Sequence, residues 1–234
     1  MARVSQEHLD ARRRQILDGA ARCFARNGFH ASSMQDVLKE VNLSAGAVYR
    51  YFSGKDELIA AVVTEVLGEI REAFEEAARQ TPPPLPDVLV GRVMTEVLGL
   101  GGAERHGLTW EGEASFPRLM VQVWTETLRD GELSALLREG FGTVREAWVK
   151  IVEGYQDAGV MRADIPAEHV ARTLIAAAQG FAAQQALFGS APVEVIQDGL
   201  RALMSVETPR EGAGPVSAAQ ASDVVILGES PRGG

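Results

Sequence analysis

The side chains best suited to chemistry lie in one short segment, residues 44–52, with the sequence SAGAVYRYF. It combines three hydroxyl-bearing residues, one arginine and three small residues: Ser44, Tyr49, Tyr51, Arg50, Ala45, Gly46 and Ala47. The hydroxyls can contact phosphates or base edges, and an arginine paired with guanine contributes about 1–3 kcal/mol of discrimination. The small residues keep a helix slim where it approaches the bases. This combination favours sequence-specific contact with DNA.

Further candidate contacts flank this segment. Ser32 and Ser33 precede it and Lys55 follows it, and all three are expected to contact the DNA backbone. The run Arg12–Arg14 is either a basic arm beside the groove or a solvated helix face. Tyr49 also has two interpretations, because a tyrosine often buries its ring and exposes only its hydroxyl.

These residues need helices to position them. Apolar periodicity, capping signals and stop signals predict helices at about residues 8–27, 33–41, 45–52, 53–79, 87–100, 115–129, 132–158, 167–188 and 193–204. Ser33-x-x-Asp36 and Ser53-x-x-Asp56 match the capping pattern of a serine followed three residues later by an acid. Prolines at positions 82, 83, 84 and 86 break the chain after the fourth helix, which we expect to bridge both parts of the molecule.

The arrangement resembles the N-terminal domain of TetR-type transcriptional repressors. The similarity covers about residues 10–60 and rests on four features in order: Gly28-Phe29, Ser32-Ser33, residues 45–52 and Lys55. Two positions depart from the family pattern, because Tyr51 replaces a more usual histidine and Ala45 replaces a common lysine. The resemblance implies that the chain beyond about residue 60 forms an all-helical domain for ligand binding and dimerisation.

We therefore predict an all-α fold with two domains. A three-helix helix-turn-helix DNA-binding domain is expected at residues 8–55 and a helical ligand-binding and dimerisation domain at 56–205. Residues 206–234, rich in Gly, Pro, Ser and Ala, are expected to form a disordered tail. Residues 1–56 carry a net charge of +3 and the remainder −12, within a total of −9. A basic head on an acidic body suits a protein that touches phosphates at one end.

Composition narrows the class of protein. No apolar run approaches the roughly 18 residues of a membrane span, so we expect no membrane partner, and the polar N-terminus lacks a secretory signal. The single cysteine, Cys23, fits a reducing cytoplasm. The four histidines are scattered, and no nucleophile, base or metal constellation is visible. We therefore expect no enzyme activity, no metal and no cofactor.

The body is expected to hold an apolar cavity. Its candidate lining residues are aromatics and one methionine: Trp110, Phe116, Met120, Trp124, Phe141, Trp148, Tyr155 and Phe181. Aromatic residues at helical spacing also pack in ordinary cores, so simple packing is the competing interpretation. A cavity of this kind would suit an apolar or aromatic small-molecule effector. The last two predicted helices carry Ala-rich faces that would pair with a second copy in a four-helix dimer interface.

The leading hypothesis is a homodimeric regulator that binds a palindromic operator in double-stranded DNA and is released by a small-molecule effector. The family resemblance favours repression over activation. One alternative is a DNA-binding regulator without a small-molecule effector, controlled by a protein partner. A second is a helical interaction protein in which residues 44–52 merely pack.

Overall fold

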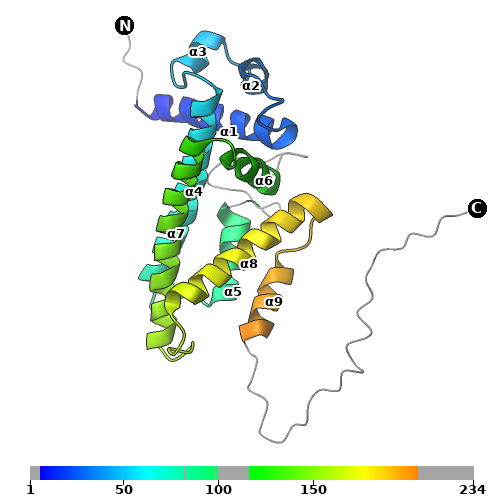
Figure 1. Ribbon diagram of the computed structural model, residues 1–234. Helices are drawn as coiled ribbons and strands as arrows, with labels where there is room; N and C mark the ends of the chain where they lie inside the picture. Colours follow the sequence, from blue (N-terminus) through cyan, green and yellow to red (C-terminus); the bar gives the residue numbers. More distant parts are fainter. Residues whose placement is uncertain (1–5, 82, 98, 100–115, 205–234) are drawn as a thin grey trace, which may run out of the picture.

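Helices account for all regular structure in the part of the chain that is described (Figure 1). The computed structural model describes residues 6–81, 83–97, 99 and 116–204. In chain order the elements are α1 Gln6–Asn27, α2 Met34–Val41, α3 Ala45–Tyr49, α4 Lys55–Arg79, α5 Pro86–Arg92, the π-helix η1 Val93–Val97, α6 Phe116–Thr127, α7 Gly131–Asp157, α8 Ala167–Phe188 and α9 Glu194–Met204. The predicted all-α class is confirmed. Trp110 and the predicted tail at 206–234 lie outside the described residues.

Helix boundaries differ most from the predicted ones in α5 and α3. The helix expected at 87–100 begins at Pro86, because the fixed φ of proline suits a first helical position, but its α-helical part ends at Arg92. It continues as the π-helix η1. The short helix α3 ends at Tyr49 rather than near Phe52, and residues 50 and 51 form a turn.

The start of α4 corrects one predicted capping box. Ser53 was expected at the N-cap with Asp56 as its acid, but the N-cap is Gly54 and the helix begins at Lys55. Ser53 lies one residue earlier, and its backbone N–H and hydroxyl both donate to Glu57 Oε2, at 2.6 and 2.7 Å. The pairing acid is therefore Glu57. These hydrogen bonds, first the backbone one, hold the pKa of Glu57 below its ordinary value.

The two longest helices, α4 and α7, form the spine of the molecule. They lie side by side along its length, and α1, α2 and α3 gather around the first turns of α4 (Figure 1). Helix α8 packs on both α7 and α6, and α5 packs on α9. Helix α4 therefore belongs to the head, α1–α3, and to the body as well.

The hydrophobic core runs without interruption from the head into the body. Where α4 meets α7, the rings of Phe74 and Trp148 lie with their centroids 4.8 Å apart. Gly140 of α7 allows the two helices to approach closely, since a Cβ at this position would lie 2.3 Å from Leu67 Cδ1. Phe74 and Trp148 are both buried. Because full burial of a large apolar side chain contributes about 1.5–3 kcal/mol, this contact stabilises the pairing of α4 with α7.

An ion pair between a buried carboxylate of α5 and an exposed guanidinium of α9 joins these two helices. The side chain of Asp87 is only 2% exposed, and its Oδ2 accepts hydrogen bonds from Arg201 Nε and Nη2 at 3.1 and 2.8 Å. Its other oxygen, Oδ1, is buried without a partner among the described residues. On the same interface, a Cβ at Gly91 would lie 2.2 Å from Gln197 Nε2. The two helices therefore pack as one unit.

Candidate DNA-binding face and ligand cavity

The short helix α3 presents its small residues to solvent. Ser44 is the N-cap, and its hydroxyl oxygen accepts a hydrogen bond from the Ala47 N–H at 3.3 Å. Ser44, Ala45 and Gly46 are exposed, and a Cβ at Gly46 would meet no atom within 4 Å. On the opposite side Val48 is fully buried and anchors the helix on the core. The predicted slim face is therefore open to a large partner.

The three polar side chains that follow differ in exposure. Tyr49 is 49% exposed, which decides between its two interpretations in favour of a surface position. Arg50 is exposed, and in the described part of the chain it makes no ion pair. Tyr51 is half-buried and packs against the core beside Phe52. Tyr49 and Arg50 are therefore the polar side chains with the freest reach.

The helix-turn-helix is closed by local hydrogen bonds at both ends of α2. Ser33 caps the helix, and its hydroxyl and backbone N–H donate to Asp36 Oδ2 at 2.6 and 2.9 Å. These bonds, first that of the hydroxyl, hold the pKa of Asp36 below its ordinary value. At the other end Asn42 takes a left-handed conformation with φ of 52°, and its N–H bonds to carbonyls of α2. The predicted capping box at Ser33 is present.

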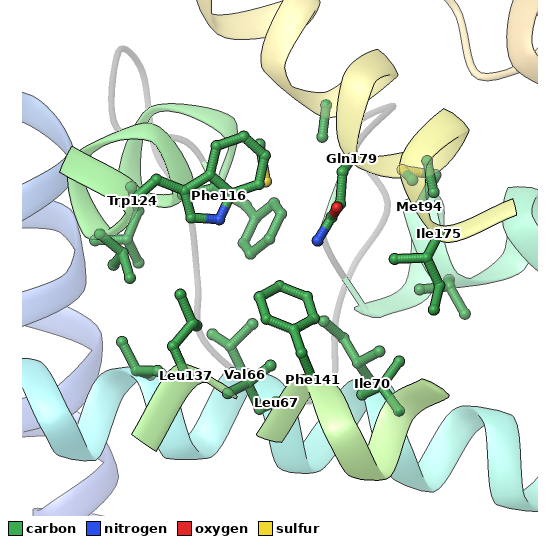
Figure 2. A pocket seen from close by; sticks show the side chains of 18 of the residues that line it. Val66, Leu67, Ile70, Met94, Phe116, Trp124, Leu137, Phe141, Ile175 and Gln179 are labelled. Atoms are coloured by element: carbon green, nitrogen blue, oxygen red, sulfur yellow. The ribbon is translucent and has the colours of Figure 1, made fainter. Parts of the chain in front are cut away.

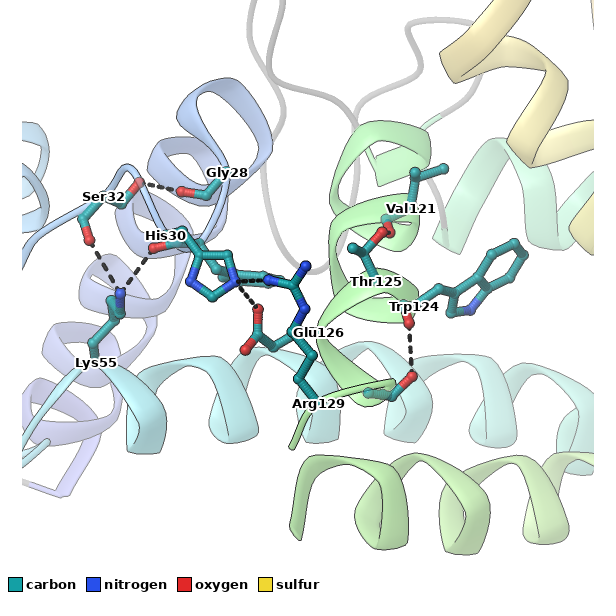
Figure 3. A network of polar contacts seen from close by, with 11 residues as sticks. Gly28, His30, Ser32, Lys55, Val121, Trp124, Thr125, Glu126 and Arg129 are labelled. Carbon is teal, nitrogen blue, oxygen red and sulfur yellow. Dashed lines mark hydrogen bonds and ion pairs between the residues drawn. The ribbon is translucent and has the colours of Figure 1, made fainter. Parts of the chain in front are cut away.

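Two predicted DNA contacts prove to be internal (Figure 3). Ser32 is 3% exposed, and its hydroxyl donates to the Gly28 carbonyl at 2.7 Å. Lys55 Nζ donates to the carbonyls of Phe29 and Ser32 at 2.8 and 3.3 Å. The backbone-contacting role of these two side chains stays a prediction: in this structure Ser32 is buried, whereas Lys55 is half-buried and both are bonded within the head. They tie the α1–α2 loop to the first residue of α4, because a buried carbonyl needs a donor.

The basic residues of the head are partly used inside the molecule. Arg13 lies over the Phe52 ring, 5.6 Å from its centroid, and pairs with Glu65 at 3.6 Å. Arg12 donates to Gln15 at 2.7 Å. Within the run Arg12–Arg14, these contacts favour the helix-face interpretation over that of a basic arm.

An apolar cavity of about 100 Å³ lies among α4, η1, α6, α7 and α8 (Figure 2). All but one of its described wall residues are apolar. Five of the predicted residues line it: Phe116, Met120, Trp124, Phe141 and Trp148. Helix α4 adds a stripe that the prediction did not include: Val62, Val63, Val66, Leu67, Ile70 and Phe74. Periodicity identifies such a stripe as buried, but it does not distinguish a cavity wall from packed core.

Two other predicted lining residues lie away from the cavity wall. Tyr155 is fully buried, and its hydroxyl donates to the Pro84 carbonyl; burial raises the pKa of this phenol, with a further contribution from the charge of Asp87. Phe181 is buried in the core on α8 but does not reach the cavity wall. In this structure both side chains pack in the core rather than line the cavity. Trp110 lies outside the described residues.

The cavity wall contains one polar side chain, Gln179, that the sequence analysis did not predict. Gln179 of α8 projects toward the rings of Phe116 and Phe141, as Figure 2 shows. It lies in an Ala-rich stretch, AAAQGFAAQQ, where nothing in the sequence separates it from the neighbouring glutamines. Only the packing of α8 on α6 and α7 sets its direction.

A polar contact joins the body to the head on another face of α6 (Figure 3). Nε2 of His30 lies 3.1 Å from Glu126 Oε2 and 3.3 Å from Arg129 Nη1. Beside it, a Cβ at Gly28 would lie 3.2 Å from Gln122 Oε1. The sequence did not indicate this contact, because His30 lies 99 residues from Arg129. Helix α6 therefore touches the cavity and the head at once.

An apolar hollow of about 290 Å³ lies on the surface between α8 and α9. Residues on its wall include Leu174, Ala177, Leu200, Leu203 and Met204. Leu203 is 75% exposed, and at the far end of α8 Phe188 is 81% exposed. Exposed apolar surface of this kind commonly marks an interaction site.

Other chemistry finds little support in the described residues. Cys23 is buried, and this burial raises the pKa of its thiol, as expected for a packing cysteine. In the described ranges no cluster of His, Cys, Asp or Glu is placed to hold a metal ion. No helix among them is long and apolar enough to cross a bilayer.

The capped α2, the open face of α3 and the helical body define a helix-turn-helix regulator. Residues 16–62 match the family described as "Bacterial regulatory proteins, tetR family", and residues 111–208 match "BetI-type transcriptional repressor, C-terminal". The chain belongs to the TetR family. This family comprises transcriptional regulators, in agreement with the prediction that the chain is not an enzyme.

Individual relatives agree with this assignment. The HTH-type transcriptional repressor Rv1474c of Mycobacterium tuberculosis is 45% identical over 65 residues, which is 28% of this chain and 35% of that protein. The chain thus matches about a third of that relative's length. The HTH-type transcriptional regulator UidR of Escherichia coli K12 is 25% identical over 82% of this chain and 90% of its own.

Three solved structures share the fold. Salmonella enterica GusR superposes with a TM-score of 0.64 at 24% identity, over 88% of this chain and 100% of that one. A protein of Saccharomonospora viridis, solved with choline, gives 0.62 at 20% identity over 83% and 96% of the two chains. FadR of Bacillus subtilis, solved with stearoyl-CoA, gives 0.61 at 16% identity over 81% and 96%.

Proposed function

We propose that this protein is a transcriptional repressor that binds a palindromic DNA operator as a homodimer and is released by an apolar small-molecule effector. The DNA-binding domain comprises residues 8–55 and the ligand-binding and dimerisation domain residues 56–205. The observation that carries the proposal is the combination, in one chain, of an open α3 face with an apolar cavity whose walls also touch the head.

On the DNA side, the face centred on α3 is the proposed contact surface. Ser44, Tyr49 and Arg50 supply the hydrogen bonds, and Ala45 and Gly46 leave room for the duplex. The hydroxyl of Ser44 accepts from a backbone N–H, so its own proton is available to a phosphate oxygen.

A gel-shift titration against the DNA upstream of its own gene tests this surface. Replacing Tyr49 and Arg50 together by alanine should weaken binding by about 5- to 150-fold, which is the effect of losing one bidentate base contact. Lys150→Ala is the matched control, because Lys150 is an exposed base on α7 of the body. Binding that is unchanged in the double variant would exclude the α3 face. Binding insensitive to salt would favour a helical interaction protein instead.

On the effector side, the size of the cavity supports a coupling between binding and release. Ligand sites usually enclose about 300–1,000 Å³, whereas this cavity holds about 100 Å³. A ligand of ordinary size must therefore displace the walls. Two of the wall helices, α4 and α6, also contact α1 of the head, so displacement of the walls would move the head.

The chemistry of the walls favours an apolar effector. The two neighbours solved with ligands hold very different molecules, since choline is a small cation and stearoyl-CoA carries a long acyl chain. Apart from Gln179, the described wall of this cavity is aliphatic and aromatic and carries no acidic group, which suits an acyl chain or a ring better than a bare cation. A regulator controlled by a protein partner would not need such a cavity.

The exposed apolar surface of α8 and α9 is the proposed dimer interface. Two such helices from each copy would form a four-helix contact and place the two α3 helices about 34 Å apart, one turn of DNA. Leu203→Glu should convert the dimer to a monomer in light scattering. Leu128→Glu is the matched control, because Leu128 is 86% exposed but lies at the end of α6, away from this surface. Equal masses for both variants at every concentration would rule out this interface.

A further inference from the structure

The cavity contains an amide that no part of the described chain satisfies. Gln179 enters the cavity from α8, opposite the rings of Phe116 and Phe141 (Figure 2). Within the described residues its side chain makes no hydrogen bond. Two other glutamines on α7 and α8 differ from it, because Gln156 and Gln185 each bond backbone groups of a nearby loop. Gln179 is half-buried, and its amide points into the cavity instead.

An unpaired amide in an apolar wall is unfavourable unless a ligand or water bonds it. Its carbonyl can accept one or two hydrogen bonds, and its NH₂ can donate two. The remaining described wall consists of aliphatic and aromatic side chains, with indole nitrogens as the only other polar atoms. A ligand that places one polar group beside Gln179 would therefore satisfy the amide while its apolar part fills the space between the rings.

The described wall also carries no charged side chain. A carboxylate held there would lose its hydration without gaining an opposite charge, and an ammonium group would gain only the faces of the aromatic rings in return, so burial of either ion is unfavourable. A neutral group such as a hydroxyl, carbonyl or amide loses far less and finds its partner in Gln179.

We propose that the effector is an uncharged, largely apolar molecule bearing one hydrogen-bonding group, and that Gln179 is the residue that selects this group. The proposal rests on the function proposed above, in which this cavity is the effector site. It goes further by fixing the charge and the polar pattern of the ligand.

A series of single-ring probes tests the proposal. A cavity of about 150 Å³ accepts benzene, so one ring needs only a modest outward displacement of the walls of this cavity of about 100 Å³. The probes are toluene, benzyl alcohol, benzylamine and benzoate, which share one ring and differ in the attached group. Dissociation constants are measured at neutral pH by ligand-observed NMR on the full chain. Wild type should bind benzyl alcohol about three- to tenfold more tightly than toluene, the value of one neutral hydrogen bond. It should bind the two charged probes most weakly.

Two substitutions at Gln179 separate its role from mere packing. Gln179→Leu should abolish the preference for benzyl alcohol while leaving toluene binding intact, and this toluene binding also shows that the cavity is folded. Gln179→Glu should reverse the charge preference, so that benzylamine, as its ammonium form, becomes the tightest of the four probes. Gln184→Leu is the matched control, since Gln184 is exposed on the same helix outside the cavity, and it should leave all four constants unchanged.

The outcomes are separable from those of the proposed function. Tighter binding of benzylamine or benzoate than of benzyl alcohol to wild type would overturn the proposal. So would no binding of benzyl alcohol, or a Gln179→Leu variant that keeps the wild-type preference. The effect of saturating benzyl alcohol on DNA affinity is measured separately. The expected probe pattern with unchanged DNA affinity would support the ligand class and contradict the release mechanism.

Discussion

Two glycines in helices provide a direct test of how the head is packed. Gly19 in α1 faces α2, and a Cβ at this position would lie 2.3 Å from Val41 Cγ1, a contact that real side chains do not make. Val41 is buried and β-branched, so its methyl groups cannot move aside without shifting the helix. Gly68, in the interior of α4, has no atom within 4 Å of its virtual Cβ. Both positions gain the same helix propensity on substitution by alanine.

The expected magnitudes follow from these two contacts. Gly68→Ala should stabilise the protein by about 0.5–1 kcal/mol, because alanine costs less backbone entropy in a helix. Gly19→Ala gains the same term but suffers overpacking of about 1–3 kcal/mol. A difference of about 2 kcal/mol between the variants corresponds to about 4–8 °C in Tm for a chain of this size.

Thermal unfolding followed by circular dichroism, together with DNA titration, measures both consequences. Gly19→Ala should unfold at the lower temperature and bind DNA more weakly, because a displaced α2 carries α3 with it. Gly68→Ala should raise Tm and leave DNA binding as it is. If the two variants showed the same rise in Tm, the described packing of α1 on α2 would be wrong.

Three further predictions concern polar contacts. Arg201→Met should lower Tm by leaving the buried Asp87 carboxylate unpaired, and combining it with Asp87→Asn should recover part of the loss, as a double-mutant cycle by thermal unfolding would show. The pKa of the Tyr155 phenol is raised in the folded protein, so its contribution to the free energy of unfolding is complete below the ordinary tyrosine pKa and is lost as pH rises toward the folded value. Tyr155→Phe should therefore reduce the loss of Tm at alkaline pH. Ser33→Ala should destabilise the head by about 1 kcal/mol and return the pKa of Asp36 toward its ordinary value, measurable by NMR titration, whereas an unmoved pKa would show that the capping box does not form in solution.

Sequence was sufficient for those features of the fold that depend on neighbours along the chain. The capping residues Ser33 and Ser44 and the helix 167–188 were located from local patterns, because caps and amphipathic faces are set within a few residues. The π-helix at Val93–Val97 was not foreseen, since its apolar residues fit an ordinary helix equally well.

The candidate sites were less predictable because they depend on distant pairings. Ser32 and Lys55 have the residue types of a phosphate contact, yet each bonds a carbonyl of the loop that follows α1. Tyr155 has the type of a cavity residue, but its partner is Pro84 in the loop between α4 and α5. Gln179 enters the cavity only because of the direction in which α8 crosses the body. Residue type indicates what chemistry is available, whereas packing decides which partner receives it.

The bond between Lys55 and the α1–α2 loop has a mechanical consequence. It fastens the head to the first residue of α4, so the two are expected to move as one rigid piece. Helix α4 has 25 residues, and at 1.5 Å per residue such a helix is about 37 Å long. Pivoted at its far end, a rod of that length swings its tip by about 3 Å for a tilt of only about 5°. One base-pair step in DNA is about 3.4 Å. A tilt of α4 caused by moving only one or two side chains at the cavity would therefore shift the head by about one base-pair step along the DNA.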